Sequence, residues 1–87
     1  MYEVRLSEDA EKVFAKCNQA LAKKLARCFS NLENSPRSHP NIKPLKGSYA
    51  GYYRYRVGDY RVVYSIKDDL VVVNVILLIA HRSKVYE

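Results

Sequence analysis

Three arginines near the middle of the chain carry the clearest chemical signal. Arg54, Arg56 and Arg61 lie within eight residues of one another and alternate with tyrosine and valine. The planar guanidinium of arginine matches the geometry of a phosphate group and stays charged at physiological pH. His81 follows a long apolar run, and histidine is the side chain best suited to exchange protons near neutral pH. Taken alone, a single histidine is more often structural or merely exposed.

Positive charge is concentrated in one part of the sequence. The 87 residues carry a net charge of +6, but residues 1–36 hold six basic and five acidic groups. Residues 37–61 hold six basic groups against the single acid Asp59. The six are Arg37, Lys43, Lys46, Arg54, Arg56 and Arg61. This excess indicates a polyanionic partner, with nucleic acid the first candidate, whereas a generic solubilising charge is the alternative.

A hairpin places the three arginines relative to one another. Residues 52–57 and 60–66 are rich in β-formers and flank Gly58-Asp59, a pair that suits a two-residue type II′ turn. Counting outward from this turn puts Arg56 opposite Arg61, and Arg54 falls on the same face because side chains alternate along a strand. The opposite face is apolar enough to meet helices. It holds Tyr60, Val62, Tyr64 and Ile66.

The paired arginines are unfavourable for stability alone. Like charges directly opposite one another on a sheet repel, and an anionic ligand would relieve that repulsion. The alternative is a solvated sheet face whose charges are screened by water. Because arginine is the best match for phosphate, we expect this face to bind phosphate.

The elements that position the hairpin can be read from the flanking sequence. Residues 2–6 alternate as in a short strand, and Ser7 can cap a helix whose first turn is acidic. A second amphipathic helix of about four turns runs toward Pro36, with an apolar stripe. The stripe consists of Leu21, Leu25, Cys28 and Leu32. Asn18-Gln19 indicates a bend between two helices, although one long helix is an alternative.

The last apolar run, Leu70 to Ile79, is typical of a central strand covered on both faces. The predicted fold is α+β in the order β-α-α-β-β-β, with two N-terminal helices packed on one face of a four-stranded, mainly antiparallel sheet. We expect a single domain over residues 1–87. The face of His81 depends on the second turn. A three-residue loop, 67–69, places it with the arginines, and a two-residue loop places it opposite.

Other features narrow the class of protein. No stretch reaches the roughly 20 apolar residues that span a bilayer, and residues 1–5 contain no apolar leader, so a cytoplasmic protein without membrane partners is expected. The spacing of Cys17 and Cys28 matches no metal-binding motif, and we interpret both as small buried apolar residues. No metal site is predicted.

Three motifs resemble the RelE/ParE superfamily of toxins, and the RelE type in particular. They are the hairpin Tyr53–Tyr64, the preceding Pro44-Leu45-Lys46-Gly47, and the ending Val71-Val72-Val73 with His81-Arg82 and Val85-Tyr86. The element order agrees, so the resemblance extends over essentially the whole chain. It implies the toxin of a type II toxin–antitoxin system, a ribosome-dependent endoribonuclease that cleaves mRNA and inhibits translation. It also implies a cognate antitoxin, a toxin–antitoxin hetero-oligomer, and no metal or organic cofactor.

The resemblance assigns roles to individual positions. RelE-type toxins activate a ribose 2′-hydroxyl for attack on the adjacent phosphate, which needs a base, an acid and cations. Arg54 and Arg56 occupy positions of lysines in RelE, and Arg61 matches an arginine that holds the phosphate. Tyr86 matches a tyrosine that stacks on or orients the RNA. Further RNA or phosphate contacts are expected from Lys43, Lys46, Arg82 and Lys84.

Two departures bear on proton transfer. Ala80 stands where RelE has an arginine that serves as general acid, and His81 is the candidate substitute. Arginine is a poorer base than lysine because its pKa is higher. Two alternatives therefore stay open. One is a ParE-type inhibitor of DNA gyrase on the same fold, and the other is a non-catalytic RNA-binding toxin-like protein.

Overall fold

The computed structural model describes residues 1–80 and contains a five-stranded sheet in the order β1-β5-β4-β3-β2. The strands are β1 (Glu3–Leu6), β2 (Ile42–Pro44), β3 (Tyr53–Val57), β4 (Tyr60–Lys67) and β5 (Val72–Ala80). Only β1 and β5 pair in parallel; the other neighbours are antiparallel. The α+β class and mainly antiparallel sheet are confirmed, but the predicted count of four strands was wrong. The extra strand, β2, was missed because it has three residues and ends in a proline.

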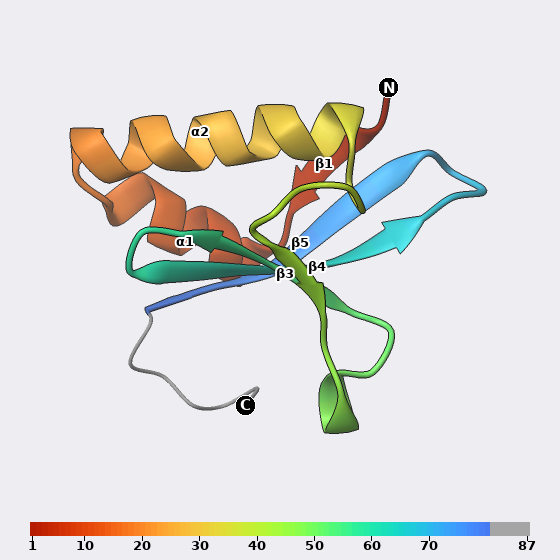
Figure 1. Cartoon of the computed structure of the whole chain (residues 1–87). Coiled ribbons are helices and arrows are strands. Elements are labelled where there is room, and N and C mark those ends of the chain that lie inside the picture. Colours follow the sequence, from red (N-terminus) through yellow and green to blue (C-terminus); the bar gives the residue numbers. More distant parts are fainter. Residues whose placement is uncertain (81–87) are drawn as a thin grey trace.

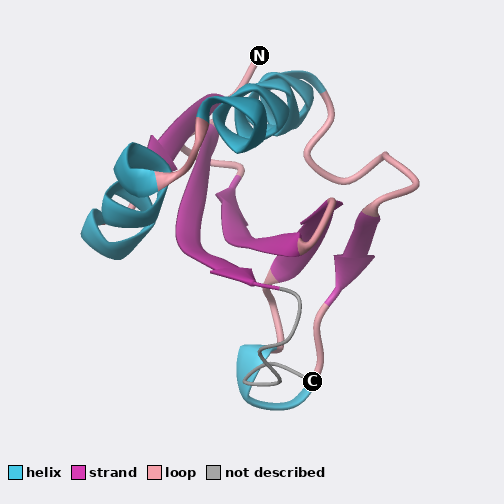
Figure 2. Cartoon of the chain, turned by 90° about the vertical axis from the view of Figure 1, so that its left-hand side faces the viewer, coloured by secondary structure: helices cyan, strands magenta, loops and turns pink. Residues whose placement is uncertain are grey.

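Two helices cover one face of this sheet (Figures 1 and 2). The helix α1 (Glu8–Lys16) begins where Ser7 Oγ accepts a hydrogen bond from the backbone N–H of Ala10 at 3.1 Å. The helix α2 (Gln19–Asn34) begins where Asn18 Oδ1 accepts from Leu21 N–H at 2.8 Å. Each cap satisfies a backbone donor that a helix leaves free, so the sequence gives two helices and not one. No helix within residues 1–80 is long and apolar enough to cross a membrane.

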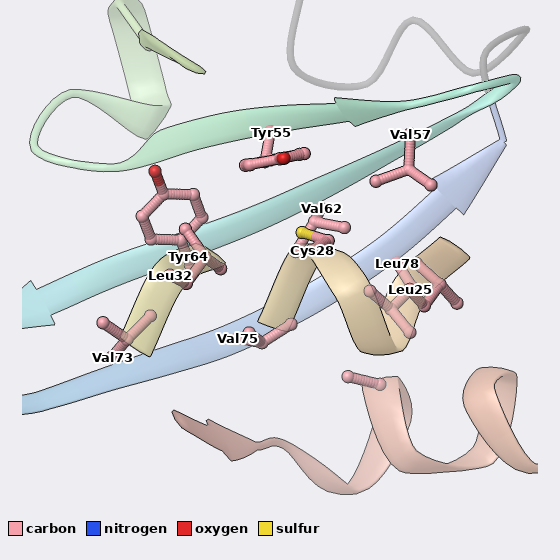
Figure 3. Close-up of a cluster of buried hydrophobic side chains, with 11 residues drawn as sticks. Leu25, Cys28, Leu32, Tyr55, Val57, Val62, Tyr64, Val73, Val75 and Leu78 are labelled. Carbon is pink, nitrogen blue, oxygen red and sulfur yellow. The ribbon is translucent and has the colours of Figure 1, made fainter. Parts of the chain in front are cut away.

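The core lies between α2 and the sheet (Figure 3). The predicted stripe of α2 supplies Leu25, Cys28 and Leu32, all of which are buried. They pack against apolar residues of three strands, namely Tyr55, Val57, Val62, Tyr64, Val73, Val75 and Leu78. Burial raises the pKa of the Cys28 thiol well above its usual range, in line with its predicted role as a small apolar residue.

The β3–β4 hairpin has the predicted register. Val57 pairs with Tyr60 across a two-residue turn, and Arg56 pairs with Arg61. Gly58 has a φ of 53°, while Asp59 is not among the residues of positive φ, which fits a type II′ turn. Tyr55 and Val62 therefore face the helices, and the arginines face away from them.

The turn between β4 and β5 differs from both expectations. Lys67 pairs with Val72, so the connection is the four residues 68–71, and neither a two-residue nor a three-residue loop is present. Leu70 and Val71, which were predicted to begin the last strand, are exposed in this turn, where Val71 has a φ of 52°. Further along, the register shifts between Val63 and Tyr64, so β5 holds an extra residue at this point.

Candidate nucleic-acid interface

The face of the sheet turned away from the helices gathers basic side chains from four strands. The pairing registers align Arg5 with Asn74, Ser65 with Asn74, and Lys43 with Arg54. We call this surface the arginine face. Its basic residues are Arg5, Lys43, Arg54, Arg56, Arg61 and Lys67, and its acidic residue within the described strands is Glu3. The prediction that Arg54, Arg56 and Arg61 share one face is confirmed.

Arg61 is buried, which the sequence did not indicate. Only 6% of its surface is exposed, whereas its partner Arg56 is exposed to solvent. Guanidinium has five N–H donors. Within residues 1–80 the hydrogen bond made by the Arg61 side chain is a long one, 3.5 Å from Nη1 to the carbonyl oxygen of Tyr60. Burying a cation is costly unless it is paired, and among the described residues Arg61 has few partners.

Asn41 holds the other two arginines in place from the connection before β2. Its carbonyl oxygen accepts from Arg54 Nη1 at 2.8 Å and from the backbone N–H of Arg56 at 3.1 Å. Its side-chain Nδ2 donates to the carbonyl oxygen of Arg56 at 3.1 Å. The bend that carries Asn41 therefore fixes both the β3 backbone and the Arg54 guanidinium.

His39 orients this bend and was not singled out from the sequence. Its Nδ1 accepts from the backbone N–H of Asn41 at 3.1 Å. Nε2 lies 3.3 Å from the hydroxyl of Tyr55, and that hydroxyl accepts a hydrogen bond from Asn31 Nδ2 at 2.8 Å. Because Tyr55 faces the helices, His39 lies behind the sheet, and its hydrogen bond with Asn41 connects it to the arginine face. No periodicity in the sequence connects residues 31, 39 and 55.

A second contact fixes the start of the same connection. Arg37 Nη1 and Nη2 donate to the two carboxylate oxygens of Asp68 at 3.1 and 2.7 Å, and the Tyr2 hydroxyl donates to the same carboxylate at 2.7 Å. We call this the Asp68 clamp. The hydrogen bonds from Arg37, followed by that from Tyr2, lower the pKa of Asp68 to about 2. Arg37, counted in the basic excess, therefore has a structural role.

A cleft opens where α2 passes the end of β3. Its volume is about 220 Å³, and it is lined by Lys24, Arg27, Asn41 and Arg56 among others. The two basic residues of α2 lie off the apolar stripe and are not among the predicted site residues. Within residues 1–80 neither Lys24 nor Arg27 forms a salt bridge. The cleft thus extends positive charge from the edge of the arginine face toward the helix layer.

Comparisons with known proteins identify the family. Residues 4–86 match the family described as the ParE toxin of the type II toxin–antitoxin system parDE. The chain belongs to the RelE/ParE superfamily of toxins. A search of curated proteins found no match.

Solved structures of this superfamily share the fold. The isolated RelE toxin of Escherichia coli is 31% identical, with a TM-score of 0.78, and the match covers 99% of this chain and 92% of that one. RelE in the archaeal RelE–RelB complex of Pyrococcus horikoshii is 26% identical, with a TM-score of 0.81 and coverage of 94% and 98%. A chain of the RelBE2 complex of Mycobacterium tuberculosis is 25% identical, with a TM-score of 0.79 and coverage of 91% and 96%.

The remaining predicted site residues divide into two groups. Lys43 is exposed on β2 beside Arg54. Lys46 is exposed directly before the short 3₁₀ helix η1 (Gly47–Tyr49), which lies beyond the sheet on the side away from α1 and α2 (Figures 1 and 2). The C-terminal candidates lie outside the described residues, so their roles stay predictions. They are His81, Arg82, Lys84 and Tyr86.

Proposed function

We propose that this toxin is a ribosome-dependent endoribonuclease of the RelE type, with the arginine face binding the mRNA backbone. The observation that carries the proposal is the buried Arg61 directly opposite Arg56. Two arginines paired across neighbouring strands repel in the free protein, and a phosphate bound beside them would be attracted to both. A surface that served only to solubilise the protein would have no reason to bury one member of the pair.

The proposed reaction is an internal transfer at phosphorus. The ribose 2′-oxygen forms a bond to the adjacent phosphorus, and the bond to the 5′-oxygen of the next nucleotide breaks. The products are a 2′,3′-cyclic phosphate and a 5′-hydroxyl. The proton of the 2′-hydroxyl goes to a base, and the leaving oxygen receives one from an acid. Arg56 and Arg61 stabilise the charge that builds on the phosphoryl oxygens, and no metal or organic cofactor is required.

Roles for proton transfer and stacking fall on the C-terminal residues. His81 is our candidate for the acid, because it is one position from Ala80, where RelE-type toxins have an arginine. Tyr86 is our candidate for stacking on an unpaired base. Arg54 suits phosphate binding better than proton transfer, because arginine is a poor base at neutral pH.

We further propose a cognate antitoxin as the protein partner, in a hetero-oligomeric complex formed in the cytoplasm. The E. coli and P. horikoshii relatives support this, because toxins of both have been solved in RelBE complexes. An acidic segment of the antitoxin would neutralise the arginine face by charge complementarity.

Primer-extension mapping of mRNA in a translating extract tests the proposal. Wild-type protein should produce cuts aligned with codons, and Arg61→Ala should abolish them. Lys12→Ala, an exposed residue of α1 on the helix side, is the matched control and should cut normally. Retention of cuts in His81→Ala would reject His81 as the acid. Arrest of growth without any cut on ribosomes would refute the proposed function.

A ParE-type gyrase inhibitor is the second candidate, because the matching family model is that of ParE toxins. Such a protein would act by binding gyrase and would not need cations arranged for phosphoryl transfer. A supercoiling assay that traps double-strand breaks in DNA, together with intact mRNA in the extract, would favour this candidate over the nuclease.

A further inference from the structure

A hollow with a mixed polar and apolar lining lies on the arginine face, at the opposite end from Arg61. Its volume is about 460 Å³, within the range of sites that hold small ligands. Its polar lining comes from four segments of the chain. They are Arg5 and Ser7 on and directly after β1, Tyr52 before β3, Ser65 and Lys67 on β4, and Asn74 on β5; Leu6, Val75 and Ile76 complete the lining. None of these residues belongs to the predicted catalytic set.

Each lining group supplies a different kind of contact. Glu3 accepts from Arg5 Nε at 2.8 Å, and within residues 1–80 the terminal amino groups of Arg5 make no further hydrogen bond. Lys67 forms no salt bridge among the described residues. Both cations can therefore bind a phosphate.

Tyr52 adds a half-buried aromatic ring. Tyr49 of η1 packs edge-to-face on it, with ring centroids 6.1 Å apart and an interplanar angle of 81°. A ring that is already held in place loses little entropy when a base stacks on it. Asn74 and Ser65 add an amide and a hydroxyl that can pair with the edge of a base. Cations, an aromatic ring and polar edge groups in one hollow are the groups that unpaired nucleotides need.

The hollow and the arginine pair lie along one strand. Ser65 follows Arg61 by four residues on β4, a distance of about 13 Å at the usual strand rise. At a stacked rise of about 3.4 Å per nucleotide this corresponds to roughly four nucleotides, and to fewer in an extended strand. A single strand bound at Arg56 and Arg61 would therefore reach the hollow within a few nucleotides.

We propose that the hollow is a second RNA subsite, which binds an unpaired nucleotide a few positions along the strand from the one held at Arg56 and Arg61. The identification of the ligand as RNA rests on the proposed function. The carboxylates of an acidic peptide could pair with Arg5 and Lys67. Such a peptide would make no use of the Tyr52 ring for stacking, or of the Asn74 amide and the Ser65 hydroxyl for pairing with a base edge. The mixture of groups therefore favours a nucleotide over a carboxylate.

Fluorescence anisotropy with 2′-O-methyl oligonucleotides tests the subsite, because these RNAs bind but cannot be cleaved through the 2′-hydroxyl. The titration compares a dinucleotide with a hexanucleotide on the full chain. The hexanucleotide should bind about tenfold more tightly, which is the usual effect of one additional stacked base. Tyr52→Ala should remove this gain, and Tyr52→Phe, which keeps the ring, should retain it.

Two further variants keep the test valid if Tyr52→Ala unfolds. Lys67→Ala should weaken hexanucleotide binding and lower the slope of log affinity against log salt by about one, without changing dinucleotide binding. Lys12→Ala is the control, because it removes the same charge from α1, which covers the other face of the sheet (Figure 1). Equal affinity for the two lengths, or equal effects of Lys67→Ala and Lys12→Ala, would overturn the subsite. So would a hexaglutamate peptide that competes as strongly as the RNA.

The two proposals can fail separately. Length-dependent binding without cuts in a translating extract would refute the nuclease and leave the subsite standing. Normal cuts with length-independent binding would refute the subsite alone.

Discussion

Replacing Arg61 by methionine should make the protein more stable and less active. Methionine fills a similar volume without charge, and exchanging a poorly partnered buried ion for an apolar side chain is often stabilising by about 1–4 kcal/mol. Arg61 is 6% exposed and has one long hydrogen bond within residues 1–80, so we expect a gain near the lower end, about 1–2 kcal/mol. For a domain of this size each kcal/mol corresponds to a Tm shift of about 4–8 °C.

Arg56→Met separates the two causes of that gain. Arg56 is exposed and lies directly opposite Arg61, so its removal relieves only the cross-strand repulsion, worth up to about 1 kcal/mol. The excess gain in Arg61→Met then reports the burial of the charge. The double variant should gain less than the sum of the two single variants, because the repulsion is removed only once.

Thermal unfolding followed by circular dichroism measures the stability, and mRNA cleavage in a translating extract measures the activity. Loss of one preorganised cation at a developing oxyanion should lower the cleavage rate by about 10²–10³-fold. If Arg61→Met lowers Tm by more than about 5 °C, the guanidinium is part of the structural framework. The inference that it awaits an anion would then be wrong.

Three further predictions concern the scaffold. At neutral pH the Tm of Asp68→Asn should be lower than that of the wild type. The difference in Tm should shrink as the pH falls from about 4 toward 2. The reason is that the ionised Asp68 carboxylate, whose pKa is lowered in the folded protein, stabilises the fold only above that range. A constant deficit over a pH series of melts would contradict the role of the charge. Ser7→Ala should lower the free energy of unfolding, measured by urea denaturation, by about 1 kcal/mol because it removes the helix cap. The control Ser30→Ala, at an exposed position, should lower it by less than about 0.5 kcal/mol, and equal losses would argue against the cap. Val71→Gly should stabilise the folded protein by about 1 kcal/mol, because glycine adopts the positive φ of this position without strain. Val71→Ala should give no such gain, and equal Tm values for the two variants in thermal melts would contradict this prediction.

The local parts of this fold could be predicted from the sequence because local chemistry decides them. The pair Gly58-Asp59 determines the hairpin register, and with it the shared face of Arg56 and Arg61. Ser7 caps the first helix as expected. These features depend on residues within a few positions of one another, where turn and capping preferences operate.

The parts that could not be predicted depend on contacts across the chain. Whether Arg61 is buried depends on what packs over the sheet, and the register shift between Val63 and Tyr64 depends on how β5 fits against β4. The contact between His39 and Tyr55 joins two segments with no common pattern. At the candidate site, sequence reasoning found the arginines but missed Asn41, which holds two of them.

The parallel pairing of β1 with β5 has a consequence for how the protein is made. Among the strands of residues 1–80, β1 pairs with β5 alone, through Glu3–Leu6 and Val72–Val75. The first strand therefore cannot pair until nearly 70 further residues have been synthesised. At elongation rates of about 5–20 residues per second this takes roughly 4–14 s. During that interval the apolar stripe of α2 lacks the strands that cover it. The nascent chain therefore passes through a period of exposure to chaperones or a binding partner before it can assemble its arginine face.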